Sequence, residues 1–137
     1  MPKPGSMPSR RKPSVDLAMT AVLLALSGQS QAADPARGRA LLAERQTSQC
    51  ALCHPIPGTP AYLQGDLAPD LRGIASRLSP AEIRHHLTDP DPASIMPSYS
   101  RTSGLINPGR LYLNRPILPE AAIDDIVAYL TTLTDPP

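Results

Sequence analysis

Two cysteines and a histidine stand together in the segment Cys50-Ala51-Leu52-Cys53-His54. Two thiols separated by two residues, with a histidine next in the chain, are typical of a site where haem is attached through two thioether bonds. Once both vinyl groups of the porphyrin are bonded, the residue after the second cysteine lies under the iron. We therefore predict that Cys50 and Cys53 bind one haem c covalently and that His54 coordinates its iron through Nε2.

Three other chemistries are open to the same side chains. A disulfide between Cys50 and Cys53 would close a very small loop and leave the adjacent histidine without a role. A thioredoxin-like redox pair requires a βαβ context, which this sequence lacks. A zinc site needs two further ligands, and the other histidines, His85 and His86, are adjacent rather than suitably spaced. Haem attachment is favoured because it uses all three side chains.

The second axial ligand of the iron is inferred by elimination. Met96 is the one methionine left once an N-terminal export segment is removed, and it precedes Pro97 in a polar loop. A methionine in such a loop has little core to fill, so we predict that its thioether binds the iron. His85 and His86 are the alternative ligands, but we expect them on the solvated face of a helix.

The first 32 residues have the pattern of an export signal. A short basic stretch precedes an apolar run at residues 17–26, and the small residues Ser30 and Ala32 suit a peptidase that cleaves after Ala32. The apolar run is shorter than the roughly 20 residues that a membrane-spanning helix needs. We predict a signal peptide over residues 1–32, general secretory export, no membrane span and one domain over residues 33–137. An uncleaved anchor is the alternative.

Composition narrows the class of protein. The formal net charge is +1, which gives no reason to expect a nucleic acid partner. Residues 33–137 carry nine arginines, no lysine and eleven acidic residues, so this part is slightly acidic. The whole chain has four tyrosines, no tryptophan and no phenylalanine. With so few large aromatic side chains, the apolar core would be small unless a buried macrocycle supplied further apolar bulk.

Four helices and long loops are predicted around these residues, with no convincing strand. The first helix is predicted over residues 35–46, with Asp34 as its N-cap. A short helix is predicted over residues 70–78. A third helix starts with the capping box Ser79-Pro80-Ala81-Glu82 and ends before Pro90.

The last helix is the clearest element of the sequence, and it follows a predicted loop over residues 89–119. Asp124 and Asp125 are predicted to lie on the face opposite its apolar residues, and Asp135-Pro136-Pro137 is predicted to end it. The apolar residues that recur at helical spacing are Ile123, Ile126, Val127, Leu130 and Leu133.

Longer segments resemble one family. Cys50–Gly58, reading CALCHPIPG, and Ile95–Tyr99, reading IMPSY, resemble SoxX, the small monohaem subunit of the SoxAX cytochromes of periplasmic thiosulfate oxidation. Arg115–Leu118 and Asp124–Leu130 resemble the end of the same family. The resemblance covers nearly all of residues 35–133.

The resemblance implies an all-α, class I cytochrome c-like fold wrapped around one covalent haem c. It implies that the first and last helices cross, with Gly38 against Tyr129. Pro69 would offer its carbonyl to His54, although Ala68 stands where such cytochromes usually have glycine.

The resemblance also implies a function. SoxX pairs with SoxA, a larger haem subunit, and together they join thiosulfate oxidatively to a cysteine of the carrier SoxYZ. The sulfur chemistry takes place on the SoxA haem, and the SoxX haem passes electrons to a downstream cytochrome. This chain would be the periplasmic, non-catalytic, electron-accepting subunit of this L-cysteine S-thiosulfotransferase, with no catalytic residue of its own.

The long loop carries more apolar residues than a small domain can bury in irregular chain. They either cover the haem edge or form a surface that packs on SoxA. The alternative function is a free-standing periplasmic monohaem electron shuttle, which would not need this loop. The apolar residues concerned are Leu105, Ile106, Leu111, Tyr112, Leu113, Ile117 and Leu118.

Overall fold

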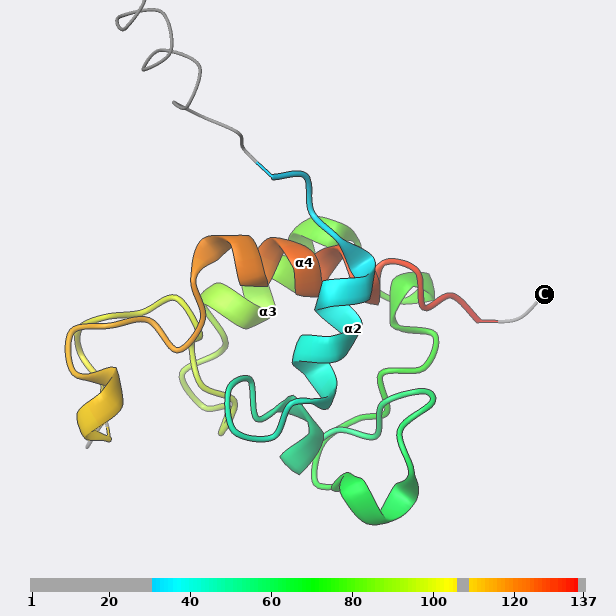
Figure 1. Ribbon diagram of the computed structural model, residues 1–137, viewed down its shortest axis with the longest axis horizontal. Coiled ribbons are helices and arrows are strands. Elements are labelled where there is room, and N and C mark those ends of the chain that lie inside the picture. Colours follow the sequence, from blue (N-terminus) through cyan, green and yellow to red (C-terminus); the bar gives the residue numbers. More distant parts are fainter. Residues whose placement is uncertain (1–30, 106–108, 136–137) are drawn as a thin grey trace, which may run out of the picture. The chain divides into compact units, whose positions relative to one another are not determined.

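The computed structural model describes residues 31–105 and 109–135, and within them every regular element is helical. The α-helices are α2 (Pro35–Ala43), α3 (Pro80–Thr88) and α4 (Glu120–Leu130). Single turns of 3₁₀ helix lie at η1 (Cys50–Leu52), η2 (Ala61–Leu63), η3 (Ile74–Ser76) and η4 (Arg110–Tyr112). The predicted all-α class is confirmed (Figure 1). Residues 1–30 of the predicted signal peptide lie outside the described residues.

Helix α2 begins where the sequence predicts but ends earlier. The Asp34 carboxylate accepts a hydrogen bond of 2.8 Å from a backbone N–H of the first turn, so Asp34 is the N-cap. The helix ends at Ala43 instead of residue 46. The Ser48 hydroxyl donates to the carbonyl oxygen of Leu41 at 2.5 Å and folds the chain back beneath the last turn.

Helix α3 starts with the predicted capping box. The Ser79 hydroxyl accepts from the N–H of Glu82 at 3.3 Å, and the Glu82 carboxylate accepts from the N–H of Ser79 at 2.7 Å. The other end of α3 lies at Thr88, ahead of the proline that was predicted to stop it. Arg84, on the α3 side facing α4, pairs with Glu120 at 3.0 Å and with Asp124.

The predicted helix over residues 70–78 is wrong, because only the 3₁₀ turn η3 lies there. Gly73 has φ of +64°, which is a left-handed conformation that interrupts a helix. The N–H of Leu71 donates to the carbonyl of Pro55 at 3.0 Å, so this backbone serves a contact distant in the sequence.

Helix α4 ends at Leu130, ahead of the predicted stop at Asp135. The hydroxyls of Thr131 and Thr132 donate to carbonyls three residues earlier, at 2.8 and 2.7 Å. Threonine hydroxyls compete in this way with the backbone hydrogen bonds that would extend a helix.

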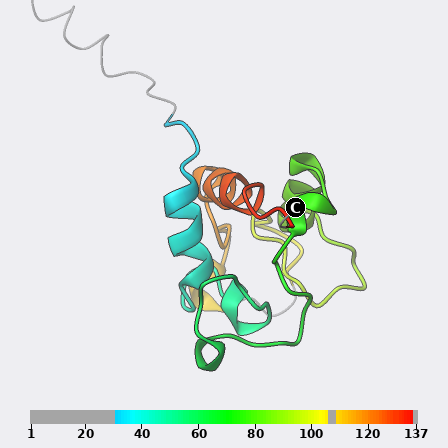
Figure 2. The ribbon, with the colours of Figure 1, turned by 90° about the vertical axis from the view of Figure 1, so that its right-hand side faces the viewer.

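Helices α2 and α4 cross instead of running side by side, as Figures 1 and 2 show. Gly38 lies at the crossing. A Cβ there would overlap the carbonyl group of Asp125 and would lie 2.9 Å from the Cβ of Tyr129. The contact of Gly38 with Tyr129 that the family resemblance implies is confirmed, because only glycine lets the two backbones approach so closely.

The prediction that Asp125 lies with Asp124 on the exposed face of the last helix is wrong. The Asp125 side chain is buried against α2 and accepts hydrogen bonds from Arg37 Nε at 2.8 Å and Nη2 at 2.9 Å. It also accepts from the N–H of Asp34 at 2.7 Å. The Arg37 guanidinium holds the pKa of the Asp125 carboxyl below its ordinary value.

One apolar core joins the helices to the segments around the cysteines and the long loop. Met96, Ile117 and Val127 are among the half-buried side chains that pack against it. Its buried members are Leu42, Cys50, Ala51, Ile56, Leu71, Ile83, Leu87, Tyr99, Leu118, Ile123, Ile126, Tyr129 and Leu130.

The crossing predicts the effect of one methyl group. We expect Gly38→Ala to lower the free energy of unfolding by about 1–3 kcal/mol, because the methyl overpacks the contact with Asp125 and Tyr129. Denaturant unfolding of the haem-loaded protein measures this. Ala40→Leu, at an exposed position of α2, is the control that adds bulk without a collision. Equal stability of Gly38→Ala and the parent would contradict the close approach.

The buried ion pair predicts a pH dependence. We expect Asp125→Asn to destabilise the protein by about 1.5–3 kcal/mol at neutral pH, because hydrogen bonds to a charged group are lost. The folded pKa of Asp125 lies below its unfolded value near 4, so the wild-type advantage is complete above about pH 4. That advantage disappears as the pH falls through the folded pKa.

Unfolding measured from pH 7 down to acid should therefore show the two curves converging. Asp124→Asn is the matched control, since Asp124 pairs with Arg84 at the surface and such a pair contributes about 0–1 kcal/mol. A constant gap between wild type and Asp125→Asn at all pH values would refute the assignment.

Candidate haem-binding site

The turn after α2 places both thiols and the histidine on one short stretch of chain. Cys50 begins η1, and its carbonyl accepts hydrogen bonds from the N–H of Cys53 at 3.2 Å and of His54 at 3.0 Å. Both cysteines carry free thiols in this structure; that of Cys50 is buried and Cys53 is partly exposed. The arrangement offers two sulfurs and an imidazole to one ligand.

The His54 ring is oriented by the backbone of a later loop. Its Nδ1 lies 2.7 Å from the carbonyl oxygen of Pro69. A carbonyl can only accept, so Nδ1 carries the proton and the Nε2 lone pair is free to bind a metal. The N–H of Ala68 donates to the carbonyl of Cys53 at 2.9 Å, so the alanine in place of glycine still permits this approach.

Gly65, which was not among the predicted site residues, connects the same loop to the cysteine turn. Its N–H donates to the carbonyl of Ala51 at 2.8 Å. A Cβ on Gly65 would overlap the carbonyl of Leu52 and lie 3.3 Å from the Cα of Cys53. A glycine in a polar loop gives no signal by itself; the need for it appears only when its neighbour, thirteen residues earlier in the chain, is known.

Gln64 closes the proline-rich loop between these segments. Its side-chain oxygen accepts from the N–H of Ile56 at 2.5 Å, and its side-chain nitrogen donates to the carbonyl of Thr59 at 3.1 Å. Prolines leave this loop few backbone donors, so a side chain supplies the missing hydrogen bonds.

Met96 lies on the segment that follows α3. It is half-buried and packs against the core, whereas its neighbour Ile95 is 86% exposed. Met96 also lines a groove of about 420 Å³. The other residues around this groove are Pro90, Asp91, Pro92, Ser94, Ile95, Pro97, Ser98, Arg101, Gly104, Leu105, Tyr112 and Ile117.

Tyr99 brings the segment of Met96 against the cysteine turn. Its hydroxyl oxygen lies 3.8 Å from Cys50 Sγ, although the two residues are 49 positions apart. Burial raises the pKa of Tyr99 and also that of the Cys50 thiol, so both groups are protonated at neutral pH. A buried, protonated thiol is a poor sulfur nucleophile.

His85 and His86, the alternative ligands, are both exposed on α3. In the residues that the structure describes, no group of three or more histidine, cysteine or acidic side chains is arranged to hold a metal ion. The donors present fit a haem: two thiols one turn apart, an imidazole with its Nδ1 fixed, and a thioether on a segment packed against the same core.

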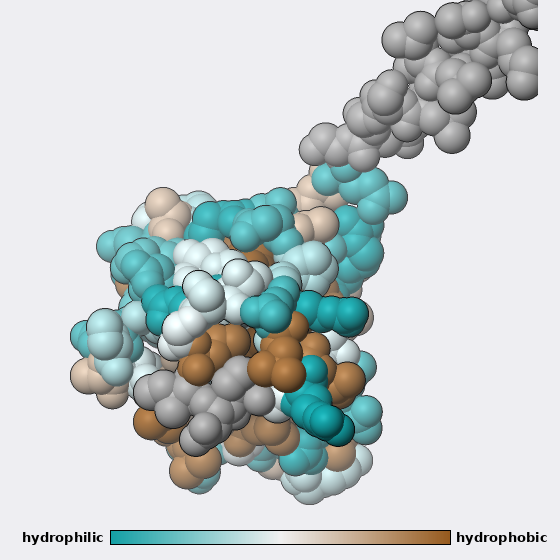
Figure 3. Space-filling view, turned by 90° about the vertical axis from the view of Figure 1, so that its left-hand side faces the viewer, coloured by the Kyte–Doolittle hydropathy of each residue, from teal (hydrophilic) through white to brown (hydrophobic). Residues whose placement is uncertain are grey.

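The long loop divides between core and surface. Leu118 is buried and Ile117 half-buried, so these two belong to the core and not to an exposed patch. Leu111 is 78% and Leu113 54% exposed, together with Ile95. Apolar side chains gather on this side of the molecule (Figure 3). Ile106, also predicted for the patch, lies outside the described residues.

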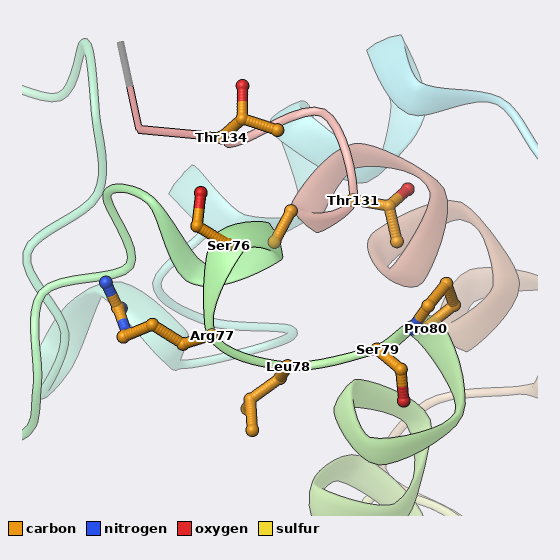
Figure 4. Close-up of a pocket in the computed structure, with 8 residues that line it drawn as sticks. Ser76, Arg77, Leu78, Ser79, Pro80, Thr131 and Thr134 are labelled. Carbon is orange, nitrogen blue, oxygen red and sulfur yellow. The ribbon is translucent and has the colours of Figure 1, made fainter. Parts of the chain in front are cut away.

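A second groove, of about 350 Å³, lies away from the predicted site. It is formed where residues 75–80, which lead into α3, pass Thr131 and Thr134 after the end of α4 (Figure 4). None of the predicted haem-binding residues lines it. None of the helices in the described ranges has the length and apolar character needed to cross a membrane.

Comparison with known proteins agrees with this geometry. The family model of cytochrome c matches residues 35–134. A chain of the crystal structure of SoxXA from P. pantotrophus is 26% identical, with a TM-score of 0.68, and the match covers 77% of this chain and 85% of that one. No curated protein matches the sequence. The predicted resemblance to SoxX-type cytochromes is confirmed, and the chain belongs to the cytochrome c family of electron-transfer proteins with covalently bound haem c.

Proposed function

We propose that this chain is the periplasmic, monohaem electron-transfer subunit of a SoxAX-type complex in thiosulfate oxidation. The observation that carries the proposal is the likeness to a chain of SoxXA over most of both chains. Residues 1–32 would direct export and be removed, and residues 33–137 would form the haem domain.

In the proposed site, Cys50 and Cys53 would hold the haem through thioethers, and His54 and Met96 would coordinate its iron. When bound, the haem iron takes up and releases one electron at a time. The Pro69 carbonyl accepts a hydrogen bond from His54 Nδ1, so Nε2 is the ring nitrogen left to bind the iron. The hydrogen bonds of Gly65 and Ala68 hold that loop in place beside the cysteine turn.

The proposed reaction of the complex requires an electron acceptor. Joining the terminal sulfur of thiosulfate to a cysteine thiol of the SoxYZ carrier forms one S–S bond and releases one proton and two electrons. Both thiols of this chain are used in thioethers, so the sulfur chemistry belongs to the SoxA haem. This chain takes the electrons singly and passes them to a downstream cytochrome.

The apolar surface of the long loop favours a stable complex with a partner over transient docking. Leu111 and Leu113 are exposed apolar side chains in a domain too small to cover them, and such surfaces mark interaction sites. Residues 33–137 contain no lysine, so the lysine-rich docking rim of a transient shuttle is missing from the sequence. We propose that this loop surface binds the SoxA subunit.

The proposed ligation predicts the spectrum of a variant. Met96→Ala should abolish the weak sulfur-to-iron charge-transfer absorption of the oxidised protein, because the thioether that gives rise to it is removed. His85→Ala and His86→Ala are the matched controls and should keep the band. An unchanged band in Met96→Ala would exclude Met96 as the ligand.

The proposed partner predicts the behaviour of the loop surface. With a SoxA-type haem subunit produced in the same periplasm, we expect the tagged wild-type chain to purify as a heterodimer. The double variant Leu111→Asp, Leu113→Asp should purify as a haem-containing monomer, because two buried charges would be left unpaired in the interface.

Leu67→Asp is the control for that experiment, since Leu67 is about as exposed as Leu111 and lies in a different loop. It should leave the heterodimer intact. A heterodimer that survives the double substitution would contradict the assigned surface. A wild-type chain that purifies alone would instead favour the free-standing electron shuttle.

A further inference from the structure

Tyr99 is a buried polar side chain to which the proposed function gives no role. Only 4% of its surface is exposed. Its backbone is held on two sides, because its N–H donates to the carbonyl of Leu87 at 2.8 Å and its carbonyl accepts from the N–H of Leu118 at 3.0 Å. The residue therefore joins the end of α3 to the segment just before α4, and its side chain has a fixed direction.

That direction leads to the haem attachment turn. The Tyr99 hydroxyl oxygen lies 3.8 Å from Cys50 Sγ. A free thiol can donate or accept in this contact, but a thioether sulfur has no proton and can only accept. Once Cys50 is bonded to haem, the tyrosine O–H is the donor of this pair.

The chain between Tyr99 and Met96 is stiff. Pro97 fixes one backbone dihedral, and the Ser98 hydroxyl donates to the carbonyl of Thr88 at the end of α3. A displacement of Tyr99 is therefore passed on to Met96 instead of being absorbed by the two residues between them.

We propose that Tyr99 is a positioning residue for the distal iron ligand. Its hydroxyl donates a hydrogen bond to the Cys50 sulfur and so holds the segment of Met96 against the cysteine turn. The inference rests on the proposed His54 and Met96 ligation. It adds a direct link between the attachment turn on one side of the site and the ligand loop on the other.

The strength of the link sets the size of the effect. An intramolecular hydrogen bond contributes about 1 kcal/mol net, which is about a fivefold change in an equilibrium constant. Added imidazole binds the iron only when Met96 leaves it. Losing the Tyr99 hydroxyl should therefore increase the affinity of the oxidised protein for imidazole about fivefold.

The test compares Tyr99→Phe with wild type in the haem-loaded, full mature protein. Imidazole is titrated into the oxidised protein while the sulfur-to-iron absorption is followed, and we expect half-loss at about one fifth of the wild-type concentration. The reduction potential should also fall, because a donor on the thioether sulfur withdraws electron density from the macrocycle. Tyr62→Phe removes a hydroxyl from a side chain that is 82% exposed and should change neither quantity.

The outcomes separate this inference from the proposed ligation. A wild-type protein without the sulfur-to-iron absorption would refute Met96 as the ligand. With that absorption present, equal imidazole affinity and potential in Tyr99→Phe and wild type would overturn the role of Tyr99. Should the variant fail to fold, proton NMR of the wild type decides: a slowly exchanging Tyr99 hydroxyl proton close to the thioether supports the link, and its absence refutes it.

Discussion

The close approach of α2 and α4 at Gly38 sets the frame on which both sides of the site are built. Helix α2 leads through residues 44–49 into the cysteine turn, and α4 is preceded by Leu118, whose N–H donates to the carbonyl of Tyr99. A rotation of one helix against the other would move the cysteine turn relative to the segment of Met96. Glycine is required because a Cβ at this position would overlap the Asp125 carbonyl and press against the Tyr129 Cβ.

Polar contacts lock this frame in one orientation. Van der Waals packing alone tolerates small rotations, but Asp125 accepts from two guanidinium nitrogens of Arg37 and from the N–H of Asp34, which fixes the start of α2 on α4. On the other side, Arg84 of α3 pairs with α4. The three helices thus have defined directions although each is short, and irregular chain between them can be held by a few hydrogen bonds to their ends.

Local signals in the sequence predicted what local chemistry determines. Asp34 and the capping box at Ser79 correctly predicted the starts of α2 and α3. The spacing of the two cysteines and His54 likewise predicts a haem from adjacent residues alone. The errors lie where the deciding contact is distant. Asp125 has the composition of an exposed helix face, and its burial depends on Arg37, 88 residues earlier. In the helix predicted over residues 70–78, the N–H groups of Leu71 and Ala75 donate instead to the distant carbonyls of Pro55 and Leu133.

The same distinction applies to the candidate site. Its residue types could be predicted from the sequence, but the residues that hold them in place could not. Cys50, Cys53 and His54 lie within one turn of chain, so their types and spacing alone predict a ligand. Gly65 and Tyr99 act on that turn from 13 and 49 residues away, one through the absence of a side chain and the other through a single hydroxyl. Neither residue type is unusual in a loop. Each of them contacts the cysteine turn from a different loop, so two loops hold this turn in place with very little regular structure.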